Sequence, residues 1–178
     1  MKSGKKPIKE GSGLTKFQKA EVLKEQIEEA FKDVSYPGDN NIVVEGNDPE
    51  GQWIKNDLRG THWKDLLQDE NKLFQHYPSI LFFTPQALKF FLPAYLIAST
   101  NFETSDMIGE TLINTLTPRP YGLRSTPKLA EFTRVLTPSQ NRAVKLFLEF
   151  IRDEYLQDPD DTPSQALRCY WNDIDAKR

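Results

Sequence analysis

The chain contains very few of the residues on which disulfide frameworks, metal sites and nucleophilic catalysis depend. Its 178 residues include one cysteine, Cys169, and two histidines, His62 and His76. A single cysteine excludes an intramolecular disulfide framework and a cysteine-rich zinc site. The nine glycines form no phosphate-binding loop, and no Gly-x-Ser-x-Gly elbow is present. We therefore predict no catalytic residues, no bound metal and no cofactor.

Long apolar runs are also absent. The most apolar stretch, residues 80–98, has Lys89 near its centre. Its helical part, which would begin at Pro85, spans only about 24 Å, against about 30 Å of hydrocarbon in a bilayer. No apolar run of signal-peptide length follows the first lysines of the chain. We therefore expect a cytoplasmic protein that does not contact membranes, with residues 80–98 buried in its core.

Positive charge is concentrated in the first residues, and the rest of the chain is acidic. Residues 1–19 carry six lysines and one glutamate, a net +5, whereas the whole chain carries −3, which leaves −8 for the remainder. An acidic body argues against a nucleic-acid-binding surface on the folded part. Residues 1–14 are expected to form a flexible basic leader, because their composition cannot bury apolar area. Contact with nucleic acid is expected only through this leader.

Most of the remaining chain shows apolar residues at helical spacing. A capping box, Thr15 with Gln18, begins the first helix, and a Tyr-Pro-Gly-Asp turn at residues 36–39 ends it. The tetrapeptide Thr-Pro-Ser-Gln begins two later helices, at residues 137–140 and 162–165. The run 42–44 is β-prone but short. We predict a mainly α fold in which residues 15–178 form a single domain of six or seven helices, with at most a minor β element.

The central element of this predicted bundle is the segment Thr84 to Thr100. Its apolar residues surround the helix axis, so it should run through the core. Pro93 lies in its middle, where it lacks an amide to pair with the Lys89 carbonyl, and we expect a kink or two abutting helices. Either Pro93 simply opens a second helix, or the freed carbonyl faces a pocket beside Tyr95 and accepts a hydrogen bond from a ligand.

Two aromatic residues, Tyr36 and Trp63, flank turn residues rather than continuous apolar runs. Tyr and Trp at a loop-rich surface are typical of binding hot spots, although they serve equally well as lids over a small core. Together with Asp39 and His62 they are candidate binding residues. The alternative is an enzyme whose site is assembled from the same loops, near these four side chains.

The remaining chemically active side chains suggest structural roles. His62 and Asp65 stand at i, i+3 on an expected short helix, and His76 could complete a metal site, but no familiar metalloenzyme spacing is present. We predict that both histidines are partly exposed polar residues. Cys169, on an amphipathic helix without a neighbouring histidine, is expected to be a small buried or half-buried apolar residue.

Four stretches together resemble a known family. They are AFKDVSYPGD at residues 30–39, GTHWKDL at 60–66, FFTPQALKFFLPAYLIAS at 82–99 and LTPSQ at 136–140. Their order is similar to that in an uncharacterised family of small bacterial proteins, a domain of unknown function. The resemblance covers residues 20–155 and implies a soluble, mostly helical fold. It implies no activity, cofactor or catalytic residue.

For function, these observations favour a non-enzymatic interaction protein that binds a protein partner, such as an accessory or immunity-type protein. The expectation rests on the missing catalytic motifs, the acidic body and the candidate aromatic residues. The enzyme alternative predicts a closed pocket that joins Asp39 or Asp65 to a histidine. A partner-binding protein predicts instead a surface with aromatic residues and scattered carboxylates.

Overall fold

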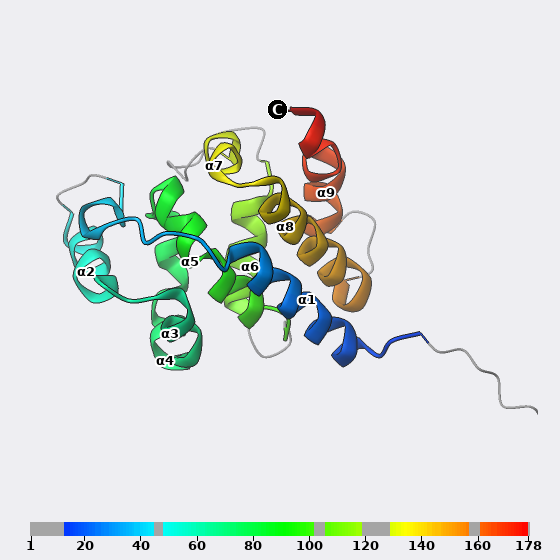
Figure 1. The fold of residues 1–178 in the computed structure, drawn as a ribbon, viewed down its shortest axis with the longest axis horizontal. Helices are drawn as coiled ribbons and strands as arrows, with labels where there is room; N and C mark the ends of the chain where they lie inside the picture. Colours follow the sequence, from blue (N-terminus) through cyan, green and yellow to red (C-terminus); the bar gives the residue numbers. More distant parts are fainter. Residues whose placement is uncertain (1–12, 45–47, 102–105, 119–128, 157–160, 178) are drawn as a thin grey trace, which may run out of the picture.

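The computed structural model describes residues 13–44, 48–101, 106–118, 129–156 and 161–177 (Figure 1). This part of the chain is mainly helical, as predicted, but it holds nine α-helices rather than six or seven. Their bounds are α1 Lys16–Phe31, α2 Pro49–Leu58, α3 Trp63–Gln68, α4 Glu70–Gln75, α5 Pro85–Ala98, α6 Asp106–Leu116, α7 Leu129–Val135, α8 Pro138–Ile151 and α9 Thr162–Cys169. Of the predicted leader, residues 1–12 lie outside the described residues.

Short helical segments of other types join these helices. Two 3-10 helices, Asp39–Asn41 and Tyr77–Leu81, follow α1 and α4. A π-helical turn, Arg152–Leu156, continues α8, and a last 3-10 segment, Trp171–Lys177, follows α9. The predicted helix count was too low partly because Asp69 both ends α3 and caps α4, so two short helices follow each other without a loop.

The helix starts show that local sequence determined where most helices begin. Thr15 and Thr137 both form complete capping boxes, with Gln18 and Gln140 respectively, as expected for this spacing. The start of α9 differs from the expectation. Asp161, not Thr162, caps this helix, because its carboxylate accepts the Ser164 amide at 2.7 Å.

The predicted β element consists of one bridge. Val43 pairs antiparallel with Phe83, and no strand is present in the described ranges. The amide of Thr84 donates to the Ile42 carbonyl and its hydroxyl donates to the Asn41 carbonyl, at 3.1 and 2.7 Å. These contacts tie the segment after α1 to the start of α5. They hold the end of segment 33–44 against the start of α5.

Helix α5 is the centre of the molecule. It packs against α1, α3, α6 and α7, and residues 90–97 are all buried. The helix is continuous from Pro85 to Ala98 with Pro93 inside it, so the expectation of two abutting helices is wrong. Proline costs one hydrogen bond here, to the Lys89 carbonyl, whereas packing on every side holds the other turns in place.

Helices α1 and α8 run antiparallel on one side of α5 (Figure 1). An ion pair between Lys19 and Glu154 joins the beginning of α1 to the turn after α8. Helices α2, α3 and α4 lie on the other side of α5, with α3 against it. The core that these helices share is rich in aromatic side chains, and the predicted core residues Phe83, Phe90 and Phe91 are buried.

No helix in the described residues has both the length and the apolar character needed to cross a membrane. The stretch at residues 80–98 lies mostly within the fold instead, as predicted, although Leu81 and Gln86 are exposed and a few other positions, mostly near its start, are partly exposed. Phe82 is one of these positions and packs against the core.

Candidate functional site

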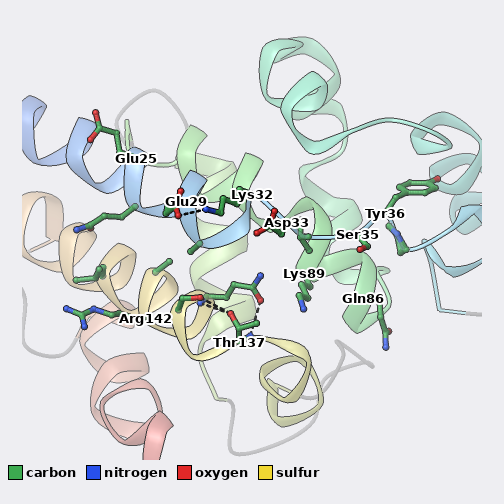
Figure 2. Close-up of a pocket in the computed structure, with 18 of the residues that line it drawn as sticks. Glu25, Glu29, Lys32, Asp33, Ser35, Tyr36, Gln86, Lys89, Thr137 and Arg142 are labelled. Carbon is green, nitrogen blue, oxygen red and sulfur yellow. Dashed lines mark hydrogen bonds and ion pairs between the residues drawn. The ribbon is translucent and has the colours of Figure 1, made fainter.

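A long open groove lies where the end of α1 approaches the beginnings of α5 and α8. Its volume is about 1080 Å³, and the segment 33–37 that leaves α1 crosses one end of it (Figure 2). The floor is formed by small apolar side chains, among them Ala30, Val34, Ala143 and Leu146. These side chains are buried or half-buried, whereas the charged side chains that line the groove beside them are mostly exposed.

The α1 wall of the groove is acidic. It carries Glu25, Glu29 and Asp33, all exposed, together with Lys32. Lys32 forms an ion pair with Glu29 at 2.6 Å, which is drawn in Figure 2. The carboxylates of Glu25 and Asp33 take part in no ion pair among the described residues, although the charge of Asp33 helps to raise the pKa of Lys32. This wall therefore presents net negative charge to the groove.

The opposite wall is basic. Helix α5 contributes Gln86 and Lys89, and α8 contributes Arg142. The Lys89 ammonium donates to the Val135 carbonyl at 2.7 Å, which links α5 to the end of α7. Arg142 is exposed and forms no ion pair within the described part of the chain. Polar side chains at the start of α8, including Ser139, continue this wall.

Tyr36 lies at the end of the groove away from Glu25 (Figure 2). Its hydroxyl donates to an Asp39 carboxylate oxygen at 2.7 Å and accepts the Gly60 amide at 2.9 Å. Gly60 has φ +66°, a conformation that glycine adopts without strain. Burial raises the pKa of Tyr36, with the Gly60 amide acting in the opposite direction. Asp39 also contacts Arg59, at 3.5 Å, so the turn after α1 is fastened to the turn after α2.

The structure brings three of the six predicted site residues into one cluster. The rings of Tyr36 and His62 each contact Phe90 edge to face, with centroids 5.4 Å apart in both pairs, and Asp39 joins through the Tyr36 hydroxyl. His62 is exposed and caps α3, because its Nδ1 accepts the Lys64 amide at 3.1 Å. The role of Tyr36, Asp39 and His62 in binding remains a prediction.

Trp63 does not lie at a loop-rich surface, contrary to the expectation. Its side chain is 1% exposed and belongs to the core. Trp63 and Leu66 stand at i, i+3 on the face of α3 that packs against α5, which explains the burial. Its indole nitrogen has no hydrogen-bond partner among the residues that the structure describes.

Pro93 and Tyr95 lie in the core, and neither is among the side chains that line the groove. The Tyr95 hydroxyl donates to the His76 carbonyl at 2.9 Å and so connects α5 with the end of α4. Complete burial raises the pKa of Tyr95 far above its ordinary value. The Tyr95 hydroxyl thus makes a buried contact between two helices. A pocket beside Tyr95, one of the two alternatives for Pro93, stays a prediction.

A buried polar cluster surrounds His76, which was expected to be partly exposed and is in fact fully buried. Its Nε2 lies 2.7 Å from an Asp57 carboxylate oxygen and its Nδ1 lies 3.0 Å from the Ser79 hydroxyl. The Trp53 ring stacks on the imidazole at 4.5 Å. This cluster was not predicted. The one usable sequence signal is that Trp53 and Asp57 stand at i, i+4 on α2, which places them on one helix face.

Charge and burial set the ionisation of this cluster. Burial lowers the pKa of His76, although Asp57 acts against this effect. The hydrogen bond from His76 lowers the pKa of Asp57. Lys72 contacts the same carboxylate at 3.7 Å and donates to the Asp57 carbonyl at 2.8 Å. Asp57, Lys72 and His76 together fasten α2 to α4.

The exposure of Cys169 also differs from the prediction. Cys169 is exposed rather than buried or half-buried, because α9 turns Ala166 and Leu167 toward the core and leaves Cys169 at its end. His62, Asp65 and His76 do not assemble. No group of three or more His, Cys, Asp or Glu side chains among the described residues is arranged to hold a metal ion.

Comparison with known proteins places the chain in a family without assigning it an activity. No curated protein and no solved structure matches it. A family model described as a family of unknown function, DUF6714, matches residues 18–175, which is most of the chain. This match confirms the prediction of an uncharacterised family and extends it to the C-terminal helices. The chain belongs to the DUF6714 family.

Proposed function

We propose that this protein is a non-enzymatic binding protein whose groove between α1, α5 and α8 receives an extended segment of a partner protein. The observation that carries the proposal is the groove itself, which has an apolar floor between walls of opposite charge. Interfaces of this kind combine an apolar centre with a polar rim, and charged side chains at the rim give specificity.

The size of the groove leaves room for a segment of polypeptide. Pockets for small molecules and cofactors have volumes of roughly 300–1,000 Å³ and enclose most of the ligand. The groove reaches about 1080 Å³, at the upper end of this range, and is only partly enclosed. An extended segment would lie along its floor, with side chains directed at both walls.

The side chains that line the groove also suit binding better than chemistry. In the described residues, the lining has carboxylates, amides, hydroxyls and basic groups, but no histidine or cysteine. The hydroxyl of Ser139 lies 2.9 Å from that of Thr137 and so belongs to the cap of α8.

An enzyme site near Tyr36, Asp39, His62 and Trp63 is the alternative. The observation that favours it is the cluster in which the Tyr36 hydroxyl, the Asp39 carboxylate and the His62 ring lie close together around Phe90. The two proposals predict different effects of substitution. Loss of function on His62→Ala, with Gln86→Trp fully functional, would favour the enzyme.

Site-specific photo-crosslinking tests the binding proposal. A benzoylphenylalanine at Gln86, an exposed residue of the groove, is expected to capture a discrete partner in extracts of the protein's native cells. The same amino acid at Gln52, exposed on α2 outside the groove, should capture none. The bulky substitution Gln86→Trp should prevent pull-down of that partner, whereas Gln52→Trp should not. Equal capture at both positions, or no effect of Gln86→Trp, would contradict the proposal.

A further inference from the structure

The groove carries unpaired charges of opposite sign on its two sides. On the α1 side, Glu25 and Asp33 are exposed and without an ion-pair partner in the described residues, while Glu29 is already neutralised by Lys32. Across the groove, Arg142 on α8 is exposed and equally without an ion-pair partner there. Figure 2 shows Glu25 and Arg142 on the two different helices.

The spacing of the two carboxylates fits an extended polypeptide. Glu25 and Asp33 are eight positions apart. Asp33 lies two residues beyond the end of α1, but Lys32 keeps helical φ and ψ angles (−57° and −36°), so the separation corresponds to about 12 Å along the helix axis. An extended chain rises about 3.3 Å per residue, so it covers this distance in about four residues. Residues i and i+4 of an extended chain lie on the same face, and one face of the segment can therefore present two side chains to α1.

This inference rests on the proposed binding function. We infer that the groove selects its partner by the arrangement of charged side chains on the segment that it binds. The segment it binds presents Lys or Arg side chains, about four residues apart, to Glu25 and Asp33, and an Asp or Glu side chain to Arg142. The apolar floor between the walls accepts small side chains from the same segment. The net −8 of residues 20–178 supports this choice, because an acidic surface raises the association rate of a basic partner.

Selection from a library of random twelve-residue peptides displayed on phage tests this inference and requires no identified partner. Peptides that bind the wild-type protein but not Gln86→Trp are groove-dependent, and we expect them to be enriched in Lys and Arg over the input library. On the variant Glu25→Lys with Asp33→Lys, groove-dependent peptides should instead be enriched in Asp and Glu.

A matched charge reversal outside the groove is the control. Glu28→Lys with Glu110→Lys changes the net charge by the same amount on exposed helix positions of α1 and α6, neither of which lines the groove. It should leave the composition of the selected peptides unchanged. If both double variants inverted the charge preference of the selected peptides, the net charge of the protein rather than the groove wall would set that preference. This result would overturn the inference.

Individual selected peptides give the quantitative test. The Kd of a basic peptide should rise about tenfold on Glu25→Lys with Asp33→Lys, and the difference should shrink as salt increases from about 0.05 to about 0.5 M because exposed charges are screened. Arg142→Glu should weaken those peptides that carry an Asp or Glu. Groove-dependent peptides without any preference for charge would overturn the inference and leave the proposed function standing. A complete lack of groove-dependent peptides would overturn both.

Discussion

His76 is the residue whose environment departs most from what its type suggests. It is fully buried, with Asp57 on one ring nitrogen and Ser79 on the other, and Trp53 covers its face. The neutral ring satisfies both contacts when Nε2 donates to Asp57 and Nδ1 accepts from Ser79. A second proton would add charge to a desolvated position, which is why burial lowers its pKa.

The lowered pKa of His76 predicts loss of stability in acid. The unfolded chain takes up a proton near the ordinary histidine pKa of 6.5, whereas the folded protein does so only at lower pH. The unfolded state therefore binds more protons between these values, so the free energy of unfolding falls as pH decreases below about 6.5. Each unit of pKa difference contributes about 1.4 kcal/mol. Urea denaturation between pH 5 and 8, followed by circular dichroism, measures the slope.

The matched variants for this prediction are the two histidines of the chain. His76→Gln removes the titrating group and should flatten the slope between pH 5 and 7. His62→Gln changes an exposed side chain and should keep the slope of the wild type. A slope that survives His76→Gln would show that another group is responsible. The lowered pKa of Asp57 makes its own contribution, which is present above the ordinary aspartate pKa of 3.8 and lost below it.

The two most deeply buried tryptophans allow the contribution of one hydrogen bond to the free energy of unfolding to be measured. The Trp171 indole donates to the Leu116 carbonyl at 2.8 Å, whereas the Trp63 indole nitrogen has no partner in the described part of the chain. Both side chains are at most 1% exposed. Trp171→Phe leaves a buried carbonyl unsatisfied, but Trp63→Phe does not. Trp171→Phe should therefore lower the free energy of unfolding by about 1–3 kcal/mol more than Trp63→Phe does. Equal losses in chemical denaturation would contradict this assignment.

At the scale of the element, α5 shows how packing overrides a local rule. A proline inside a helix costs about 3 kcal/mol relative to alanine, yet α5 is continuous through Pro93. The surrounding residues are buried on every side, so leaving the helix would expose a large apolar area. The helix is therefore stabilised by its neighbours rather than by its own hydrogen bonds.

Pro93→Ala compares the cost of the missing hydrogen bond with the contribution of the buried proline ring to packing. Alanine restores the hydrogen bond to the Lys89 carbonyl but removes two buried methylenes, worth about 0.8 kcal/mol each. We expect the free energy of unfolding to rise by about 1 kcal/mol and the protein to keep its partner, because Pro93 does not line the groove. Pro85→Ala is the control, since Pro85 occupies the first turn of α5, where the missing amide costs nothing.

Two outcomes would change this interpretation. A loss of stability on Pro93→Ala would show that packing of the proline ring outweighs the restored hydrogen bond. Normal folding with loss of the partner would instead support the hypothesis that the Lys89 carbonyl, freed by Pro93, accepts a hydrogen bond from a ligand.

At the scale of the whole molecule, three distant segments meet to form the groove. The end of α1, the start of α5 and the start of α8 each provide one side, and the end of segment 33–44 is held against the start of α5 by Thr84 and the Val43–Phe83 bridge. The Lys89 contact with the Val135 carbonyl fixes the distance between α5 and the beginning of α8. The shape of the groove thus depends on long-range contacts.

Local sequence determined the features that depend on neighbouring residues. The capping boxes at Thr15 and Thr137, the turn at Gly38 with φ +88° and the apolar surface of α5 all follow from interactions within a few positions. The mainly α class and the core role of the phenylalanines were predictable for the same reason. Tyr36 could be selected as a candidate because an aromatic residue beside a Pro-Gly turn has few apolar neighbours in the chain.

Tertiary structure decided which side chains are buried and which of them meet. Trp63 and His76 are both flanked by polar residues in sequence, yet α5 covers the first and the contacts with α2 enclose the second. Glu25 and Arg142 lie on opposite sides of the groove, although they are more than a hundred positions apart in the chain. No local sequence pattern encodes this arrangement. Helix packing sets such distances through the sum of many contacts, which is the physical reason why sequence alone determined the helices and tertiary structure determined the site.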